Sequence, residues 1–237
     1  MPQILTTHTL SCGDHEFNTF SIAARCPRTG AYGVAVSTAR PGVGAVVPWV
    51  SKHGAIATQA RTNTEIGRKG LALLEKGIPF RVALQALLAS DPDQAFRQVH
   101  GVGPEDSFVH TGSECKPWCG HRVETGLTVS GNLLVGPEVL DAMLESFLKH
   151  VALDISARLM LALEAGQTAG GDKRGKQSAA LLIFSDDPKP YHNLRVDDHP
   201  DPVNELRRLF DMMAGYADTL EQQYGREGVR LYRRVKA

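Results

Sequence analysis

The stretch TFSIAARCPRTGAYGVAVST, residues 19–38, decides the fold of this chain. Across residues 17–25 large apolar residues alternate with small or polar ones, which is the period of a half-buried strand. The sequence PRTG at residues 27–30 has the composition of a turn, and residues 32–38 (YGVAVST) have the pattern of a second strand. We therefore predict that the two strands form a hairpin.

The segments on either side of this hairpin alternate in blocks of strands and helices. Further extended segments are predicted over residues 45–50, 54–60, 107–111, 121–129, 178–184 and 194–196. Helices are predicted over residues 62–74, 79–88, 137–150, 154–164 and 202–220, with a short one opening at Asp91. This order lacks the regular alternation of a doubly wound parallel sheet. It favours an α+β fold with antiparallel sheets and helices in separate layers.

Composition places the chain among ordinary globular proteins and excludes several partner classes. Its 237 residues suffice for one large domain, and 26 basic side chains balance 26 acidic ones. Nucleic-acid binders usually show a basic excess, so we expect no such partner. No apolar run approaches the roughly 20 residues of a membrane span, and residues 1–16 do not resemble a secretory signal. We expect a cytoplasmic protein with no membrane partner.

Cysteine usage fits a reducing compartment. Four cysteines (Cys12, Cys26, Cys115 and Cys119) are too few for a disulfide scaffold in a chain of this length. Cys115, Cys119 and His121 have a spacing that could hold three zinc ligands, but no second Cys/His pair follows to complete four. The favoured interpretation is a loop with two free thiols, and we predict no metal and no cofactor.

The sequence GGDKRGKQSAALLI, residues 170–183, is a polar, glycine-rich turn that leads into a buried strand. Turns of this kind are where folded enzymes place groups that contact ligands. We therefore predict that Asp172, Lys173 and Arg174 bind a polar substrate.

Two positions near strand ends carry groups suited to acyl transfer. Thr19 opens the first core strand, and its hydroxyl becomes a nucleophile if a base, such as its own free α-amine, removes the proton. The alternative is that Thr19 is only a good strand former. Asn132, in the sequence SGNL, either donates to an oxyanion or is a turn residue with positive φ.

Two further polar groups are candidates for a site. In the sequence RVDDHPDP, Asp197, Asp198 and His199 either orient a general base or bind a hard cation, while Asp201 is a good helix N-cap. Thr58 and Gln59 lie in a strand, GAIATQA, that otherwise reads as buried. They either line a site or find backbone partners.

Several long motifs resemble a bacterial domain-of-unknown-function family, number ten-twenty-eight (DUF1028). The matching stretches include TFSIAAR (19–25), YGVAVST (32–38), VGAVVPW (43–49), GAIATQA (54–60), PWCGHR (117–122), GNLLVGPEVLDAM (131–143), GGDKRGKQSAALL (170–182) and LRVDDHPDPVNELRRLF (194–210). The family is placed by fold among the N-terminal nucleophile (Ntn) hydrolases. The resemblance therefore implies a four-layer αββα sandwich, with amide hydrolysis as the superfamily's usual chemistry.

By this analogy Thr19 is the nucleophile, with Asn132 as oxyanion donor and Asp198 and His199 ordering the pocket. We assign substrate binding to Arg40, Trp49, Thr58, Gln59, Asp172, Arg174 and Gln177. A free amine at Thr19 requires cleavage after Asn18, so we divide the chain into an N-terminal extension or propeptide (1–18), one Ntn-like domain (19–224) and a C-terminal tail (225–237).

The predicted function is hydrolysis of a C–N bond in a small non-peptide substrate by a homodimer. Two alternatives remain. One is a hydrolase that uses Asp197, Asp198 and His199, with or without a divalent metal. The other is a non-catalytic protein that binds a metabolite on the same fold.

Overall fold

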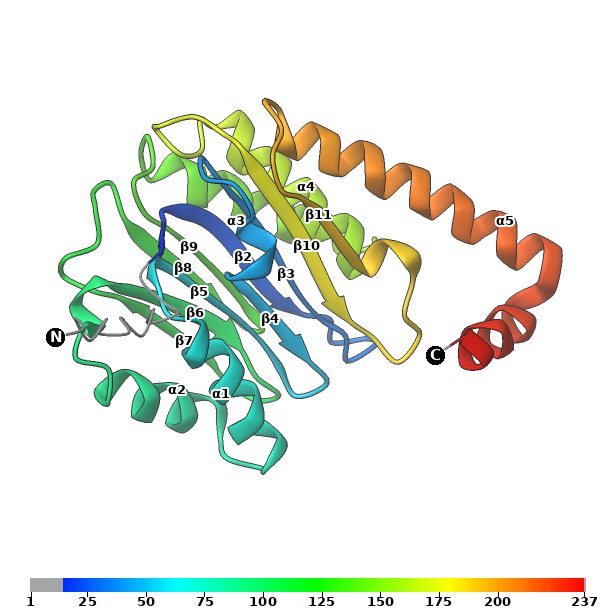
Figure 1. The fold of residues 1–237 in the computed structure, drawn as a ribbon, viewed down its shortest axis with the longest axis horizontal. Coiled ribbons are helices and arrows are strands. Elements are labelled where there is room, and N and C mark those ends of the chain that lie inside the picture. Colours follow the sequence, from blue (N-terminus) through cyan, green and yellow to red (C-terminus); the bar gives the residue numbers. More distant parts are fainter. Residues whose placement is uncertain (1–14, 237) are drawn as a thin grey trace, which may run out of the picture.

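The computed structural model describes residues 15–236 of the chain, with side-chain surroundings for residues 16–226. It contains two antiparallel sheets, and each carries helices on its outer face (Figure 1). The strands are β1 (His15–Phe17), β2 (Thr19–Arg25), β3 (Tyr32–Thr38), β4 (Pro48–Ser51), β5 (Gly54–Thr62), β6 (Arg97–Val102), β7 (Ser107–Thr111), β8 (Gly120–Glu124), β9 (Leu127–Gly131), β10 (Ser178–Phe184) and β11 (Asn193–Val196). The α-helices are α1 (Thr64–Glu75), α2 (Phe80–Ala89), α3 (Glu138–Lys149), α4 (Ile155–Thr168) and α5 (Pro202–Lys236).

The first sheet has the order β1-β5-β6-β7, with β4 also paired to β5, and the second has the order β11-β10-β3-β2-β9-β8. All the strand pairs are antiparallel. Helices α1 and α2 cover the first sheet, and α3, α4 and α5 cover the second (Figure 1). The α+β, antiparallel sandwich predicted from the sequence is confirmed.

Strand β2 explains how the sequence sorts its side chains between layers. Phe20 and Ile22 pack with the α3 and α4 residues, whereas Ala23 packs between the two sheets. Alternate residues of a strand point to opposite faces, so Thr19 and Ser21 share the inter-sheet face with Ala23. The hairpin predicted from residues 19–38 is present as β2 and β3, with Thr19 opposite Thr38.

The ends of the helices follow ordinary capping chemistry. Asn63 accepts a hydrogen bond from the backbone of Glu65 and begins α1, and Asp154 does the same for α4 through Ser156 and Ala157. Gly77, with φ of 80°, follows the end of α1 in the left-handed conformation common after helices. Helix α5 extends well beyond the predicted end, and its helical path is interrupted at Gly225 (φ 66°, ψ 165°), where the predicted tail begins.

Several expected elements differ from the observed ones. The six buried residues of β6 were not predicted as a strand, and the expected strand over residues 121–129 is the hairpin β8–β9. A 3-10 turn (Gln94–Phe96) replaces the short helix expected after Asp91. Another (Val43–Ala45) occupies the start of the extended segment expected over residues 45–50.

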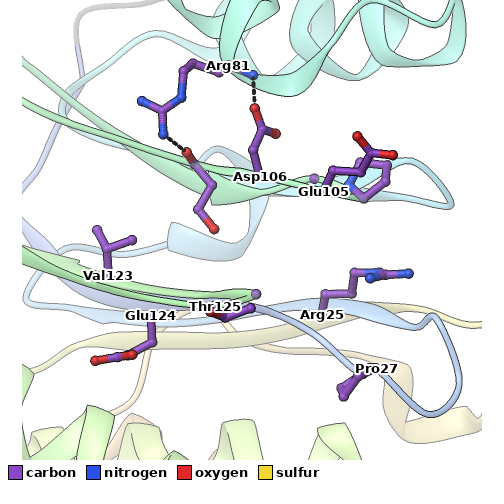
Figure 2. A pocket seen from close by; sticks show the side chains of 12 residues that line it. Arg25, Pro27, Arg81, Glu105, Asp106, Val123, Glu124 and Thr125 are labelled. Atoms are coloured by element: carbon purple, nitrogen blue, oxygen red, sulfur yellow. Dashed lines mark hydrogen bonds between the residues drawn. The ribbon is translucent and has the colours of Figure 1, made fainter.

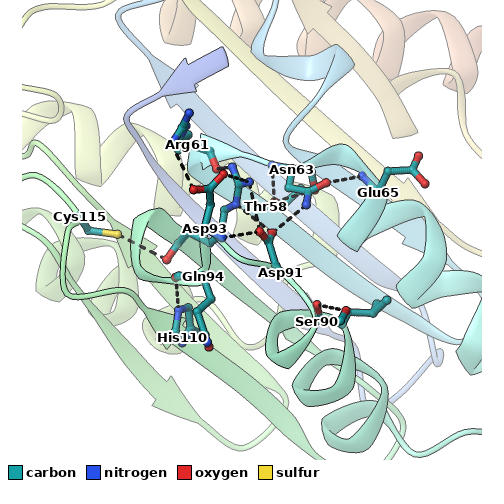
Figure 3. A network of polar contacts seen from close by, with 12 residues as sticks. Thr58, Arg61, Asn63, Glu65, Ser90, Asp91, Asp93, Gln94, His110 and Cys115 are labelled. Atoms are coloured by element: carbon teal, nitrogen blue, oxygen red, sulfur yellow. Dashed lines mark hydrogen bonds and ion pairs between the residues drawn. The ribbon is translucent and has the colours of Figure 1, made fainter. Parts of the chain in front are cut away.

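A buried ion pair ties the covering helices to the first sheet (Figure 3). The Nε atom of Arg97, on β6, lies 3.0 Å from Oδ2 of Asp91, and both side chains are almost fully buried. Asn63 donates to the same carboxylate at 2.8 Å. Burial raises the pKa of Asp91, but the hydrogen bonds from Arg97 and Asn63 outweigh it and hold that pKa below its usual value.

Candidate active site

The chain passes from the first sheet to the second at Asn18, between β1 and β2. Strand β1 pairs with β5, so residues 15–17 form part of the first sheet. Residues 1–14, which make up the rest of the expected propeptide, lie outside the described residues, and so does Cys12. Asn18 and Thr19 are both buried. The predicted nucleophile therefore lies where the two layers are joined by a single residue.

Thr19 has an unpartnered hydroxyl inside the protein. Its side chain is fully buried, and Oγ1 makes no hydrogen bond to any residue that the structure describes. The backbone N–H of Asn132 donates to the Thr19 carbonyl at 3.0 Å, which places Asn132 opposite Thr19 just beyond β9. A buried polar atom without a partner calls for an explanation in a native fold. A reacting hydroxyl is one such explanation.

The carbonyl that precedes Thr19 is held by two donors. The Asn18 oxygen accepts from Oγ1 of Thr38 at 2.6 Å and from Nη2 of Arg174 at 2.9 Å. Arg174 is itself held by Asp172, whose carboxylate is fully buried and lies 3.0 Å from Nε of Arg174. The glycines of this turn permit its left-handed backbone, with φ of 59° at Gly171.

Beside Thr19, the interior between the sheets is polar. Ser21 Oγ lies 2.5 Å from Oε1 of Gln59 and 2.7 Å from Nε2 of His100, whose Nδ1 lies 2.9 Å from Oγ1 of Thr128. Gln98 bonds to both Gln59 and Asn132 at 2.8 Å. The other half of this interior is apolar, with Val34, Val36, Ala55, Ala57 and Ala180. The polar half adjoins the predicted nucleophile.

Two backbone outliers flank this polar half. Among the described residues other than glycine, Ala60 (φ 67°) and Leu133 (φ 57°) have a left-handed backbone. Each directly follows a residue of the network, Gln59 and Asn132. Such conformations cost of order 1–3 kcal/mol and cluster at functional sites.

His100 gives the protein a predicted pH dependence. Burial, with a smaller contribution from His121, lowers the pKa of His100 to about 3 from a usual 6.5. The unfolded chain therefore gains a proton below pH 6.5 that the folded protein does not. The free energy of unfolding should fall with pH from 6.5 towards 3, by about 1.4 kcal/mol per pH unit from this group.

Urea unfolding at pH 7 and pH 5 checks this slope, with His100→Gln as the comparison. We expect the variant to be less stable than the native protein at pH 7 but to lose less stability on acidification. Equal losses in the two proteins between pH 7 and pH 5 would show that His100 is not held neutral by the fold.

The acidic cluster before α5 does not assemble into one site. Asp197 pairs with Arg195 at 2.9 Å, Asp198 accepts from Gln177 at 3.1 Å, and His199 Nδ1 accepts from the backbone of Asp201 at 3.0 Å. These contacts shape the turn between β11 and α5. Gln177 connects this turn to the candidate site, because its backbone N–H donates to the Thr38 carbonyl.

Three other predicted residues make contacts with groups other than Thr19. Arg40 is exposed, and its carbonyl accepts from Ser178. Trp49 donates to the Val46 carbonyl and packs so tightly on Gly67 of α1 that any side chain there would strike the indole. Thr58 bonds to the Asn63 carbonyl beneath α1, on the face opposite to Gln59.

The cysteine loop has local partners as well. Cys115 Sγ contacts the Arg97 carbonyl, Cys119 Sγ contacts the Cys115 carbonyl, and His121 lies 3.0 Å from Thr111 Oγ1. Burial raises the pKa of both thiols, that of Cys115 to about 11. Within residues 15–236, no group of three or more His, Cys, Asp or Glu is arranged to hold a metal ion.

Sequence analysis missed Thr38, Ser21, Gln98, His100 and Thr128. Each is a fully buried polar residue in a strand. The same signal that drew attention to Gln59, a polar residue in a strand that otherwise reads as buried, is present for Gln98 and His100 in RQVHGV. The signal is not recognised there because Gln98, His100 and Gly101 interrupt the apolar alternation by which a strand is predicted.

A separate pocket of about 560 Å³ opens at the far end of β2 (Figure 2). Arg25, Arg81, Glu105, Asp106 and Glu124 are among its lining residues, and none of the predicted site residues lines it. In that pocket the backbone N–H of Arg81 donates to the Asp106 carboxylate, and its guanidinium donates to the Ser107 carbonyl. Because Thr19 opens β2 and Arg25 closes it, this pocket lies remote from the predicted nucleophile.

Comparison with known proteins gives a family and a fold. Residues 19–206 match the model of a family of unknown function (DUF1028). The chain is also similar to a protein of Silicibacter pomeroyi, described as matching the same family model, whose crystal structure is known. The identity is 32% and the TM-score is 0.76, over 84% of this chain and 93% of that chain. No curated protein matches. Among the described residues, no helix is long and apolar enough to cross a membrane.

Proposed function

We propose that this protein, which belongs to the family of unknown function DUF1028, is an Ntn-type hydrolase that cleaves a C–N bond in a small non-peptide substrate. Thr19 is its nucleophile. The observation that carries the proposal is the junction at Asn18–Thr19, where a buried, unpartnered hydroxyl follows a carbonyl held by two donors. The family match supports it too, because it begins at Thr19.

The two donors are suited to charge that develops on the Asn18 oxygen. Attack on a carbonyl turns its oxygen into an oxyanion, and fixed donors near 2.7–3.1 Å stabilise that state in a site closed to water. Thr38 supplies a neutral hydroxyl at 2.6 Å, and Arg174 supplies a charged donor at 2.9 Å. The buried carboxylate of Asp172 keeps the guanidinium in place.

The first reaction is cleavage of the chain itself. Thr19 Oγ1 forms a bond to the Asn18 carbonyl carbon, and the C–N bond to Thr19 breaks. The nitrogen takes the proton that the hydroxyl gives up, which leaves an ester. Water hydrolyses the ester to a carboxyl at Asn18 and restores the Thr19 hydroxyl. The product carries a free α-amine on the same residue as the nucleophile.

Turnover of a substrate repeats this chemistry. The free α-amine of Thr19 accepts the proton of the Thr19 hydroxyl, and Oγ1 attacks the substrate carbonyl. The C–N bond of the substrate then breaks, and the leaving amine of the substrate takes that proton. The substrate oxygen takes the position of the Asn18 oxygen, between Thr38 and Arg174. Water then hydrolyses the acyl-enzyme. A small substrate is favoured because the chain has no net charge with which to bind a polymer.

The proposal includes a cytoplasmic homodimer formed through the outer helices. Its support is a stripe on α5, where Met212, Tyr216 and Tyr224 are each about half exposed at spacings of four and eight residues. Exposed apolar patches of this kind mark contact surfaces. Light scattering of the purified protein would give the mass of one chain if the dimer is wrong.

The mass of the purified protein under denaturing conditions tests the function. We expect a chain that begins at Thr19, because denaturation releases any segment held without a covalent bond. A full-length mass after prolonged incubation would leave Thr19 without a free amine and would overturn the mechanism. It would favour a protein that binds a metabolite without turnover.

A further inference from the structure

Gln98 reaches from the first sheet into the second, and its direction is fixed by backbone. Its Nε2 lies 2.9 Å from the Gly131 carbonyl and 3.1 Å from the Gly120 carbonyl. A carbonyl oxygen can only accept a hydrogen bond. The nitrogen of Gln98 must therefore face these two groups, and its Oε1 must face the opposite way.

The direction of Gln98 determines that of both neighbouring carboxamides. Its Oε1 lies 2.8 Å from Gln59 Nε2 and 2.8 Å from Asn132 Nδ2, and an acceptor there requires a donor from each. Gln59 then presents Oε1 to Ser21, which donates its one hydroxyl hydrogen at 2.5 Å.

The same chain of donors fixes the tautomer of His100. Because the Ser21 hydrogen is given to Gln59, His100 Nε2 must carry a hydrogen and donate it to Ser21 Oγ at 2.7 Å. His100 Nδ1 then accepts from the Thr128 hydroxyl at 2.9 Å. The opposite tautomer would require Gln59 and Gln98 to turn over, with Gln98 Oε1 against two carbonyl oxygens.

Asn132 is the last member of this network, and it lies opposite Thr19. Its Nδ2 donates a hydrogen bond to Gln98, while its Oδ1 is buried and bonds to no residue that the structure describes. We infer that Gln98 is a positioning residue that makes Asn132 present its acceptor Oδ1, and not its Nδ2, to the site at Thr19. The group that this site holds beside Asn132 is thus an N–H or O–H donor.

The role of Asn132 Oδ1 in the reaction rests on the proposed function. The α-amine freed at Thr19 has N–H groups and one lone pair. Asn132 Oδ1 accepts one N–H and so orients the lone pair towards the hydroxyl that the amine must deprotonate. The oxyanion is then left to Thr38 and Arg174. This role for Asn132 differs from the oxyanion donor expected from the sequence.

The protonation of the two ring nitrogens of His100 shows in which direction the hydrogen bonds of this network run. In ¹⁵N NMR spectra of the labelled full chain at pH 7, we expect Nε2 to be protonated and Nδ1 to be bare. The same measurement on Thr19→Ala, in which the peptide bond after Asn18 is expected to stay intact, gives the result without any cleavage. Protonation at Nδ1 would reverse the network, turn Asn132 Nδ2 towards Thr19 and overturn the inference.

Gln98→Glu tests the role by a pH profile. The introduced carboxyl, when neutral, keeps an O–H donor towards the two carbonyls and an acceptor towards Asn132, whereas an ionised one has no donor. Burial raises the pKa of such a carboxyl. Relative to the native protein, we expect the cleaved variant to hydrolyse an N-acyl p-nitroanilide at nearly the native rate in acid and tenfold or more slowly as the carboxyl ionises. Gln98→Met should be slow at every pH.

The outcomes separate the inference from the proposed function. A native chain that is never cleaved, but whose His100 carries its proton on Nε2, contradicts the function and leaves the direction of Asn132 intact. A rate of p-nitroanilide hydrolysis by Gln98→Glu that follows the native pH profile throughout would overturn the positioning role. If Gln98→Met does not fold, the acid rate of Gln98→Glu supplies the comparison.

Discussion

Replacing Thr19 with alanine is expected to abolish cleavage after Asn18 and turnover of any amide substrate, while the protein stays folded. The variant lacks the only atom that attacks the carbonyl in the proposed mechanism. The structural cost is small, because the Thr19 hydroxyl has no partner among the described residues and its removal breaks no hydrogen bond. Loss of one buried methyl group costs about 1 kcal/mol.

Denaturing mass spectrometry measures cleavage of Thr19→Ala, and urea unfolding measures its stability. Thr19→Ser is the matched control, since it keeps a hydroxyl and should still be cleaved. Hydrolysis of N-acyl p-nitroanilides is the probe of turnover. A Thr19→Ala protein that is cut or turns over like the native one would leave Thr19 as an ordinary strand residue.

Replacing Thr38 with valine is expected to slow cleavage after Asn18 by about 10²–10³-fold, which is the usual cost of losing one oxyanion donor. The substitution nearly preserves shape and removes the hydroxyl that donates to the Asn18 carbonyl at 2.6 Å. The loss should appear in the rate and not in the final extent, because Thr19 and Arg174 remain.

Substitution of Thr38 tests the stabilisation of the oxyanion with less effect on the fold than substitution of Arg174. Removing Arg174 would leave the buried Asp172 carboxylate without its ion-pair partner, a change that costs about 3–5 kcal/mol. Ser37→Ala serves as the control, because this neighbour on β3 donates to the Ser178 carbonyl and not to Asn18. Equal cleavage rates in Thr38→Val and Ser37→Ala would show that the Thr38 hydroxyl does not stabilise the transition state.

The parts of the fold that sequence predicts are those with a clear apolar period. Strands β2, β3 and β10 alternate or run apolar because their side chains meet apolar layers. Strand β6 fails that criterion, since Gln98 and His100 are buried against other polar groups and Gly101 lies so close to the Ala55 carbonyl that no side chain fits. The turn between β8 and β9 depends on the positive φ of Gly126 alone.

The candidate site divides in the same way. Thr19, Asn132, Asp172 and Arg174 can be singled out as polar residues at strand ends or in a glycine-rich turn, and the structure brings them around the carbonyls of Asn18 and Thr19. Thr38 could not be found, because its importance comes from lying opposite Thr19 in the register of two strands. Asp197, Asp198 and His199 attract attention by composition; Asp197 and His199 make contacts within their own turn, and Asp198 accepts from Gln177.

The crossover at Asn18 joins strand β1 covalently to β2 of the second sheet, although β1 pairs with β5 of the first. Its three residues remain on β5 because they are tethered to β2, and a short tether acts as an effective concentration on the order of millimolar. A cut at Asn18–Thr19 removes that advantage in one step and turns an intramolecular contact into a bimolecular one. A paired segment of three residues has little affinity of its own. Cleavage would thus weaken the hold of β1 on β5 in the same event that creates the amine of Thr19.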